Sequence, residues 1–191
     1  MSSKPTHPVH KPIFVAAWIL VTIVCVVFSA TAFEFYFFLK ADLMPSYAQF
    51  LEWAVSHEYA FGASSGMVEA RPYWLAMPEP NKLVLGLHTV LAAGCLALAP
   101  IQMTRWVRSR APRIHRALGR VYVVAGVISM LAAMVYLSMT PLTKIYGGRP
   151  FAIGLWGVAI ITLYTFVMAA VHAARREIWQ HRTLMVLNFC L

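Results

Sequence analysis

Charged side chains are scarce in this sequence. Asp, Glu, Lys and Arg make up 12% of its 191 residues, whereas 60% of the residues are hydrophobic. A soluble globule of this length needs more polar surface than that, which excludes a soluble fold and favours an exterior that faces lipid. The alternation of apolar and polar residues typical of a membrane β-barrel is missing too. Because every backbone amide in hydrocarbon must be paired internally, the sequence predicts an all-α integral membrane protein.

Several motifs of soluble enzymes and metal proteins are absent as well. The three cysteines, Cys25, Cys95 and Cys190, lie within apolar stretches without metal-type spacing, so they predict neither a disulfide nor a zinc site. No Ser/His/Asp set, glycine-rich phosphate loop or metalloprotease helix is present, and a hydrolase therefore has no support.

Acidic residues are few. The chain has 7 of them against 16 Lys and Arg, a formal net charge of +9. In a soluble protein this excess would suggest nucleic acid, but here the basic residues cluster at the ends of apolar segments. Their distribution is therefore a signal of membrane topology, and no nucleic-acid partner is predicted.

Apolar runs long enough to cross a bilayer, which requires ~20 helical residues, recur along the chain. A further apolar segment, Thr183 to Leu191, would rise only ~14 Å as a helix. Either it stops within the bilayer or the natural chain continues. The prediction is one transmembrane domain over residues 1–191, an antiparallel helical bundle of four complete spans plus the start of a fifth. The complete spans are predicted at residues 13–39, 83–104, 118–140 and 151–173.

The loops on the two sides of the predicted bundle differ in charge. One side carries eleven basic residues and the single acid Glu177, and the other carries five basic residues and six acids. By the positive-inside rule the N-terminal tail and the basic loops are cytoplasmic, which places the protein in a bacterial inner membrane. The basic residues of that side are Lys4, Lys11, Arg105, Arg108, Arg110, Arg113, Arg116, Arg120, Arg175, Arg176 and Arg182.

The long loop at residues 40–82 is then extracytoplasmic. Apolar residues recur at helical spacing in its segment from Pro45 to Tyr59. This pattern fits an amphipathic helix on the membrane surface, and it fits equally a folded loop with aromatic anchors at the interface.

Four of the seven histidines lie in or beside predicted spans: His88, His115, His172 and His181. Ionisable groups at membrane depth are costly, so they tend to mark ligands, proton paths or buried partners. His115 and Gly119 are four residues apart and share a helix face. A glycine one turn from an imidazole leaves room for a flat group such as a porphyrin.

His115 and His181 are predicted at the same depth on different helices, as a six-coordinate b-type haem requires. His172 could replace either of them. Arg116 and Arg120, also four residues apart, could pair with haem propionates or with lipid phosphates. The competing interpretation of the two interfacial histidines is contact with lipid headgroups.

His88 lies deeper and could instead form a hydrogen bond between helices. Together with Glu34 it could also belong to a transporter of small solutes or metals, although the spans carry few polar groups for a hydrophilic path.

Three segments together resemble a family of predicted bacterial membrane proteins of unknown function: His88 to Gln102, His115-Arg116-Ala117-Leu118-Gly119-Arg120-Val121-Tyr122, and His181-Arg182. That family is distantly similar to two-haem transmembrane cytochromes b and ferric-reductase-like proteins. The resemblance implies that His115 and His181 hold an inner haem and that His88 matches one outer ligand. The outer partner expected in the fourth span is missing from residues 151–161.

These observations lead to a functional expectation. The protein is expected to bind haem b between its helices and to exchange electrons with quinone or a neighbouring redox subunit. The alternative is a cofactor-free accessory subunit or assembly factor of a larger membrane complex, packed through small-residue helix faces.

Overall fold

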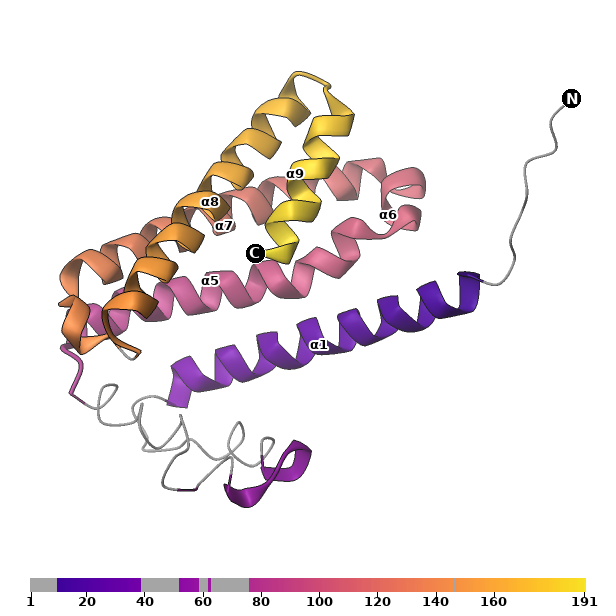
Figure 1. The fold of residues 1–191 in the computed structure, drawn as a ribbon. Coiled ribbons are helices and arrows are strands. Elements are labelled where there is room, and N and C mark those ends of the chain that lie inside the picture. Colours follow the sequence, from indigo (N-terminus) through magenta and orange to yellow (C-terminus); the bar gives the residue numbers. More distant parts are fainter. Residues whose placement is uncertain (1–9, 39–51, 59–61, 63–75, 146) are drawn as a thin grey trace, which may run out of the picture.

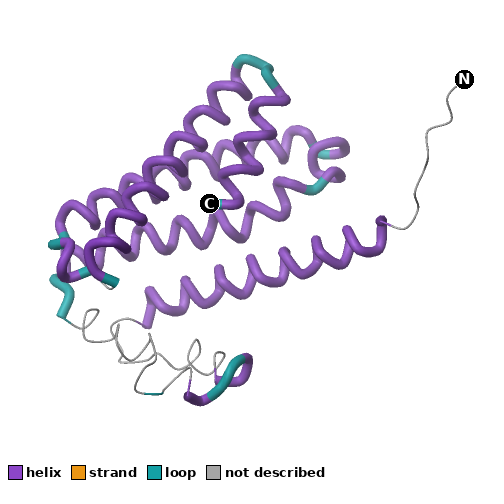
Figure 2. The backbone as a smooth tube through the Cα atoms, viewed as in Figure 1, coloured by secondary structure: helices purple, strands orange, loops and turns teal. Residues whose placement is uncertain are grey.

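The computed structural model describes residues 10–38, 52–58, 62, 76–145 and 147–191. Within these residues the regular structure is helical and no strand occurs, as Figure 2 shows. This agrees with the predicted all-helical class. The elements are α1 (His10–Phe38), α5 (Glu79–Met103), α6 (Arg105–Arg110), α7 (Pro112–Met139), the 3-10 helix η1 (Leu142–Lys144), α8 (Gly148–Ala174) and α9 (Ile178–Cys190).

Three of the helices, α5, α7 and α8, are long and apolar enough to cross a membrane. In α1 the stretch Val15–Ala30 forms a shorter apolar helix among the residues whose side chains are described. Large apolar side chains point outward on all of these helices, for example Leu20, Leu83, Val124 and Ile153. Such a surface is expected of helices that face lipid rather than water.

The helices form a bundle in which α5 packs against α7, α7 against α8, and α8 against α9, while α1 lies along α5 (Figure 1). The turn between α7 and α8 lies at one end of the bundle. Helix α6 and the turn between α8 and α9 lie toward the opposite end, which we call the arginine-rich end. Its arginines are Arg105, Arg108, Arg110, Arg113, Arg116, Arg120, Arg175, Arg176 and Arg182.

The helix boundaries follow from local chemistry. Helix α5 begins after Pro78, has a proline in its first turn and carries Glu79 where the helix dipole favours an acid. It ends before Thr104, whose backbone is extended and whose hydroxyl donates to the Ile101 carbonyl at 2.8 Å. Helix α7 begins at Pro112, again a favoured first position, six residues before the predicted start of that span.

The turn from α8 into α9 has the hydrogen bonds of a Schellman motif. The Glu177 amide donates to the His172 carbonyl at 2.9 Å, and the Arg176 amide donates to the Ala173 carbonyl at 3.1 Å. Arg176 has φ = 61°, the left-handed conformation that glycine adopts more readily. Helix α9 starts at Ile178, which places its first turn before the predicted fifth apolar segment.

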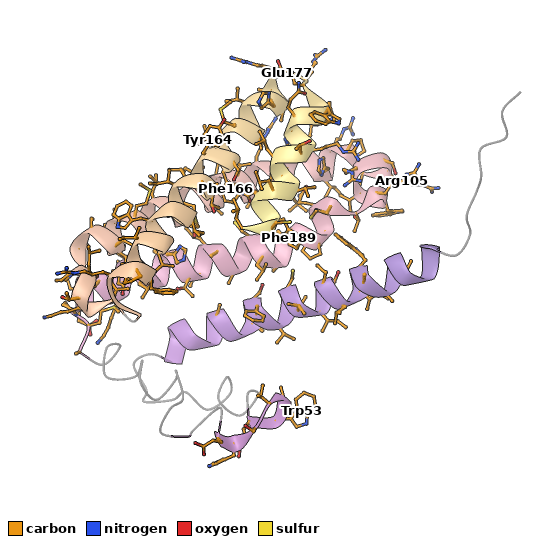
Figure 3. All side chains as sticks on the ribbon, viewed as in Figure 1. Trp53, Arg105, Tyr164, Phe166, Glu177 and Phe189 are labelled. Atoms are coloured by element: carbon orange, nitrogen blue, oxygen red, sulfur yellow. The ribbon has the colours of Figure 1, made fainter. Side chains whose placement is uncertain are left out.

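The core of the bundle lies where α5, α7 and α8 meet. Tyr122 and Phe166 are buried there with ring centroids 5.4 Å apart, and Met185 and Phe189 of α9 pack against this cluster. Figure 3 shows Phe166 and Phe189 between the helices and Tyr164 on the outer side of α8. Helix α9 therefore completes the core even though it is short.

The predicted amphipathic segment from Pro45 to Tyr59 lies outside the described residues except for residues 52–58. In that stretch Trp53 is 83% exposed. The choice between a surface helix and an anchored loop stays a prediction. The side chain of Glu34 also lies outside the described residues.

Candidate functional site

His115 lies in the first turn of α7, where Gln102 of α5 reaches it. In the amide orientation that satisfies all neighbouring groups, Gln102 Nε2 donates to His115 Nδ1 at 2.6 Å and Gln102 Oε1 accepts from the Gly119 amide at 3.1 Å. A Cβ added to Gly119 would lie 3.9 Å from the nearest atom of the Gln102 amide, an ordinary contact. The predicted shared face of His115 and Gly119 is thus present, and Gln102 lies against it.

The Gln102 amide can present either end to the imidazole, and the choice sets the tautomer. With the amino group toward Nδ1, the ring hydrogen of His115 is on Nε2. With Oε1 toward Nδ1, Nδ1 carries the hydrogen and Nε2 is free to bind a metal. The second arrangement sets Gln102 Oε1 against the His115 carbonyl oxygen and Nε2 against the Gly119 amide, so the first arrangement is the more favourable of the two.

His181 lies in the first turns of α9 and is oriented by α8. Its Nδ1 lies 2.9 Å from the carbonyl oxygen of Ala169. A carbonyl only accepts, so Nδ1 is the donor and Nε2 is left unprotonated in the neutral ring. Metal-binding histidines are commonly held by such a hydrogen bond from the other ring nitrogen to a backbone carbonyl.

His115 of α7 and His181 of α9 lie on different helices at the arginine-rich end. His115 interacts electrostatically with His181, and also with Arg108 and Arg116. Both histidine side chains are partly buried. The predicted pairing of His115 and His181 at one level is therefore compatible with the fold.

The two arginines predicted near the site lie on the outside of α7. Arg116 and Arg120 are both exposed, and neither has a carboxylate within ion-pair distance in the described part of the chain. Arg108, from α6, also lies within electrostatic range of His115, a neighbour that the sequence analysis did not predict.

His88 lies in a different part of the bundle, against α7. Its Nδ1 is 3.0 Å from the Ser129 carbonyl oxygen, and Ser129 Oγ donates to the His88 carbonyl at 3.0 Å. Ser129 is completely buried. This is the interhelical hydrogen bond considered for His88 as an alternative to haem ligation, and it links α5 to α7.

His172, the substitute candidate, is engaged elsewhere. Its Nδ1 forms a short hydrogen bond with Glu177 Oε2 across the α8–α9 turn. Glu177 is the acid of the arginine-rich end, and Figure 3 shows it at the tip of that turn. His172 therefore belongs to the contacts of the α8–α9 turn.

Sequence reasoning missed a second polar group, in the centre of the bundle. Asn188 of α9 is buried, donates to Thr165 Oγ1 at 2.8 Å and to the Thr162 carbonyl at 3.3 Å, and accepts from the Tyr122 hydroxyl at 3.2 Å. The available signal was a lone asparagine in an apolar segment. Buried amides in hydrocarbon require partners, and here two helices, α7 and α8, supply them.

A metal site with several protein ligands is not formed by the described residues. No group of three or more His, Cys, Asp or Glu side chains lies together in that part of the chain. Haem iron takes its equatorial ligands from the porphyrin and requires only two imidazoles from the protein. His115 on α7 and His181 on α9 are two imidazoles at the arginine-rich end.

The comparison with protein families decides the classification. The model of the family described as Predicted membrane protein (DUF2306) matches residues 85–191. The chain belongs to this family. The DUF2306 region contains α7, α8 and α9 and nearly all of α5, and therefore every histidine discussed above. The predicted membership in a family of membrane proteins of unknown function is confirmed, whereas the similarity to cytochromes b stays a prediction. No curated protein and no solved structure matches the chain.

Proposed function

We propose that this DUF2306 protein is a membrane electron-transfer protein that holds one b-type haem between α7 and α9. The observation that carries the proposal is the hydrogen bond that fixes the Nδ1 of His181 to the Ala169 carbonyl, at the same end of the bundle as His115 on α7. That hydrogen bond leaves the Nε2 of His181 as a ready ligand. The haem would supply one-electron redox chemistry between two imidazole ligands.

The groups around His115 and His181 can each be assigned a role. The Ala169 carbonyl holds the tautomer and ring orientation of His181. Gln102 would hold His115 in the same way once its amide is turned so that Oε1 accepts the Nδ1 hydrogen. Arg108 places positive charge near the His115 ring, which favours a carboxylate or an added electron close by. Quinone or a neighbouring redox subunit is the partner that would exchange electrons with this site.

The proposal includes a topology. We place four complete spans, α1, α5, α7 and α8, and the start of a fifth, α9, in a bacterial inner membrane. The arginine-rich end and the N-terminal tail face the cytoplasm, because nine arginines of the described chain gather at that end with Glu177 as their acid. The proposed haem then lies near the cytoplasmic face.

The experiment is a haem-occupancy assay on purified variants. His115→Ala and His181→Ala should each abolish the low-spin absorption, because either change removes one of the two imidazoles that would hold the haem. His172→Ala is the matched control, since it removes an imidazole from the same end but belongs to the turn. Each variant should elute as a monodisperse, helical protein. Retention of low-spin haem by both His115→Ala and His181→Ala would refute the assignment.

A cofactor-free accessory subunit is the second candidate. The contacts of His88 favour this second candidate, because the His88 ring hydrogen-bonds to Ser129 and links α5 to α7. His88→Asn separates the two functions, because it should weaken the α5–α7 contact and leave the haem at the other end in place. The same result assigns the outer histidine to packing rather than to ligation.

A further inference from the structure

One buried hydroxyl group in the bundle is left without a hydrogen bond. Thr162 lies in the middle of α8, and the residue is only 8% exposed. Its Oγ1 is fully enclosed and has no hydrogen-bond partner in the described part of the chain. Because hydrocarbon offers no solvent to satisfy such a group, an unpaired hydroxyl at this depth is costly.

Thr162 differs in this respect from other threonines of the helices. A threonine within a helix can donate to a carbonyl of the preceding turn. Thr22, Thr89 and Thr183 donate to the carbonyl four residues earlier, at 2.8, 2.9 and 3.1 Å. Thr162 makes no such bond. Its hydroxyl is therefore available to a group from outside α8.

The main chain of Thr162 places this hydroxyl beside the polar network of Asn188. The Thr162 carbonyl accepts from the Asn188 amide at 3.3 Å and from Thr165 Oγ1 at 2.8 Å. Oγ1 belongs to the same residue and is only a few covalent bonds away from that carbonyl oxygen. Since Oγ1 is enclosed, it points into the bundle, where α8 packs against α7 and α9, rather than toward lipid.

The network at Asn188 has spare acceptors but no spare donor. The Asn188 amide donates to Thr165 Oγ1 and to the Thr162 carbonyl, which uses both of its hydrogens. The hydroxyl hydrogens of Tyr122 and Thr165 are used as well. Asn188 Oδ1 accepts from Tyr122, and a carbonyl oxygen has a second lone pair. The network can therefore accept further hydrogens, whereas the Thr162 hydroxyl has one to give.

A water molecule has the donors and the acceptor that this arrangement requires. It can accept the hydrogen of Thr162 Oγ1 and donate its own two hydrogens to oxygens such as Asn188 Oδ1. Buried waters typically make about three hydrogen bonds to polar groups that are otherwise unsatisfied. The buried ring of Phe166, one turn later on α8, lies between the helices (Figure 3). Packing of such large side chains around the site favours a ligand no larger than water.

We propose that Thr162 binds one internal water, which connects its Oγ1 to the network of Asn188 and Tyr122 between α7, α8 and α9. The water would help to hold α9 against α8 in the apolar part of the bundle. The site does not depend on the haem proposed near His115 and His181, because neither imidazole takes part in it.

The test is oxygen-17 relaxation dispersion of water, recorded on the full chain in immobilised detergent micelles. This measurement counts long-lived internal waters, and hydroxyl groups of the protein do not contribute because the signal comes from the water oxygen. Thr162→Val keeps the shape of the side chain and removes the hydroxyl, so about one internal water per chain should be lost. Thr183→Val is the matched control. It removes an exposed hydroxyl that is bonded within α9, and the number of internal waters should stay the same.

Unfolding of the same variants by SDS gives a second readout. Thr162→Val should unfold at a lower SDS fraction than the wild type, because the variant loses the bonds made through the water. An unchanged number of internal waters in Thr162→Val would overturn the site. Stability equal to or above that of the wild type would show that the hydroxyl is unpaired, which also overturns it. Loss of the same water in Thr183→Val would overturn its assignment to Thr162.

Discussion

The hydroxyl of Tyr122 on α7 donates to Asn188 Oδ1 on α9 at 3.2 Å, in the buried centre of the bundle. The amide of Asn188 is bonded in turn to Thr165 and Thr162 on α8. One side chain thus connects three helices and fixes the rotation of α9 about its axis. Since His181 lies two turns earlier on α9, the direction of its imidazole depends on this connection.

Tyr122→Phe should therefore destabilise the protein. The change leaves Asn188 Oδ1 without its donor, and interhelical hydrogen bonds in membranes contribute about 0.6 to 1.7 kcal/mol. Unfolding by SDS in mixed micelles measures the difference. Tyr164→Phe, at a residue that is 58% exposed, is the control and should be close to neutral. Equal stability of the two variants would mean that the Asn188 network contributes nothing.

Gly126→Ala should destabilise the junction of α7 and α8. A Cβ at this position would lie 2.2 Å from Cζ of Phe166, so the buried ring has to move. Overpacking of this kind costs about 1 to 3 kcal/mol. Thermal denaturation in detergent measures it, and Phe166→Leu in the same chain should recover part of the loss. Gly154→Ala should do no harm, because no atom lies within 4 Å of the added carbon.

Arg176→Gly should stabilise the α8–α9 turn. Arg176 has φ = 61°, a conformation that glycine adopts without steric cost. The expected gain is about 0.5 to 1 kcal/mol. Arg175→Gly removes the same charge at φ = −77°, where glycine only adds flexibility, and should lower the melting temperature. Identical shifts in the two variants would contradict a conformational origin.

Cysteine labelling tests the proposed orientation. Ser109 in α6 and Thr143 in η1 are both exposed and lie at opposite ends of the bundle. In a background with Cys190→Ser, a membrane-impermeant maleimide should label Thr143→Cys from outside intact cells. Ser109→Cys should react only after the membrane is opened. Labelling of Ser109→Cys in intact cells would reverse the topology.

Much of this fold could be predicted from hydropathy, because the cost of lipid-exposed polar backbone leaves few alternatives to helices. The predicted spans fall within α5, α7 and α8 apart from a residue or so at their ends. Hydropathy did not predict the residues at which the helices begin. Arg113 to Ala117 continue α7 beyond its apolar part, since arginine is a good helix former even where it is not a good lipid contact.

The candidate site was predictable only in part. Helical spacing placed His115 and Gly119 on one face, and charge placed His181 at the same end. The residues that orient these rings, Gln102 and the Ala169 carbonyl, come from other helices. The link between Tyr122 and Asn188 spans 66 positions along the chain. Such contacts are set by how helices pack, which single-sequence periodicity does not encode.

The most direct test of the account is the reduced-minus-oxidised absorption spectrum of the purified wild-type protein. If His115 and His181 bind haem b, the spectrum should show the sharp α and Soret bands of a low-spin bis-imidazole haem, in stoichiometric amount with the polypeptide. A colourless protein that is monodisperse and fully helical, and that stays colourless when haem is supplied during expression, would contradict the central claim.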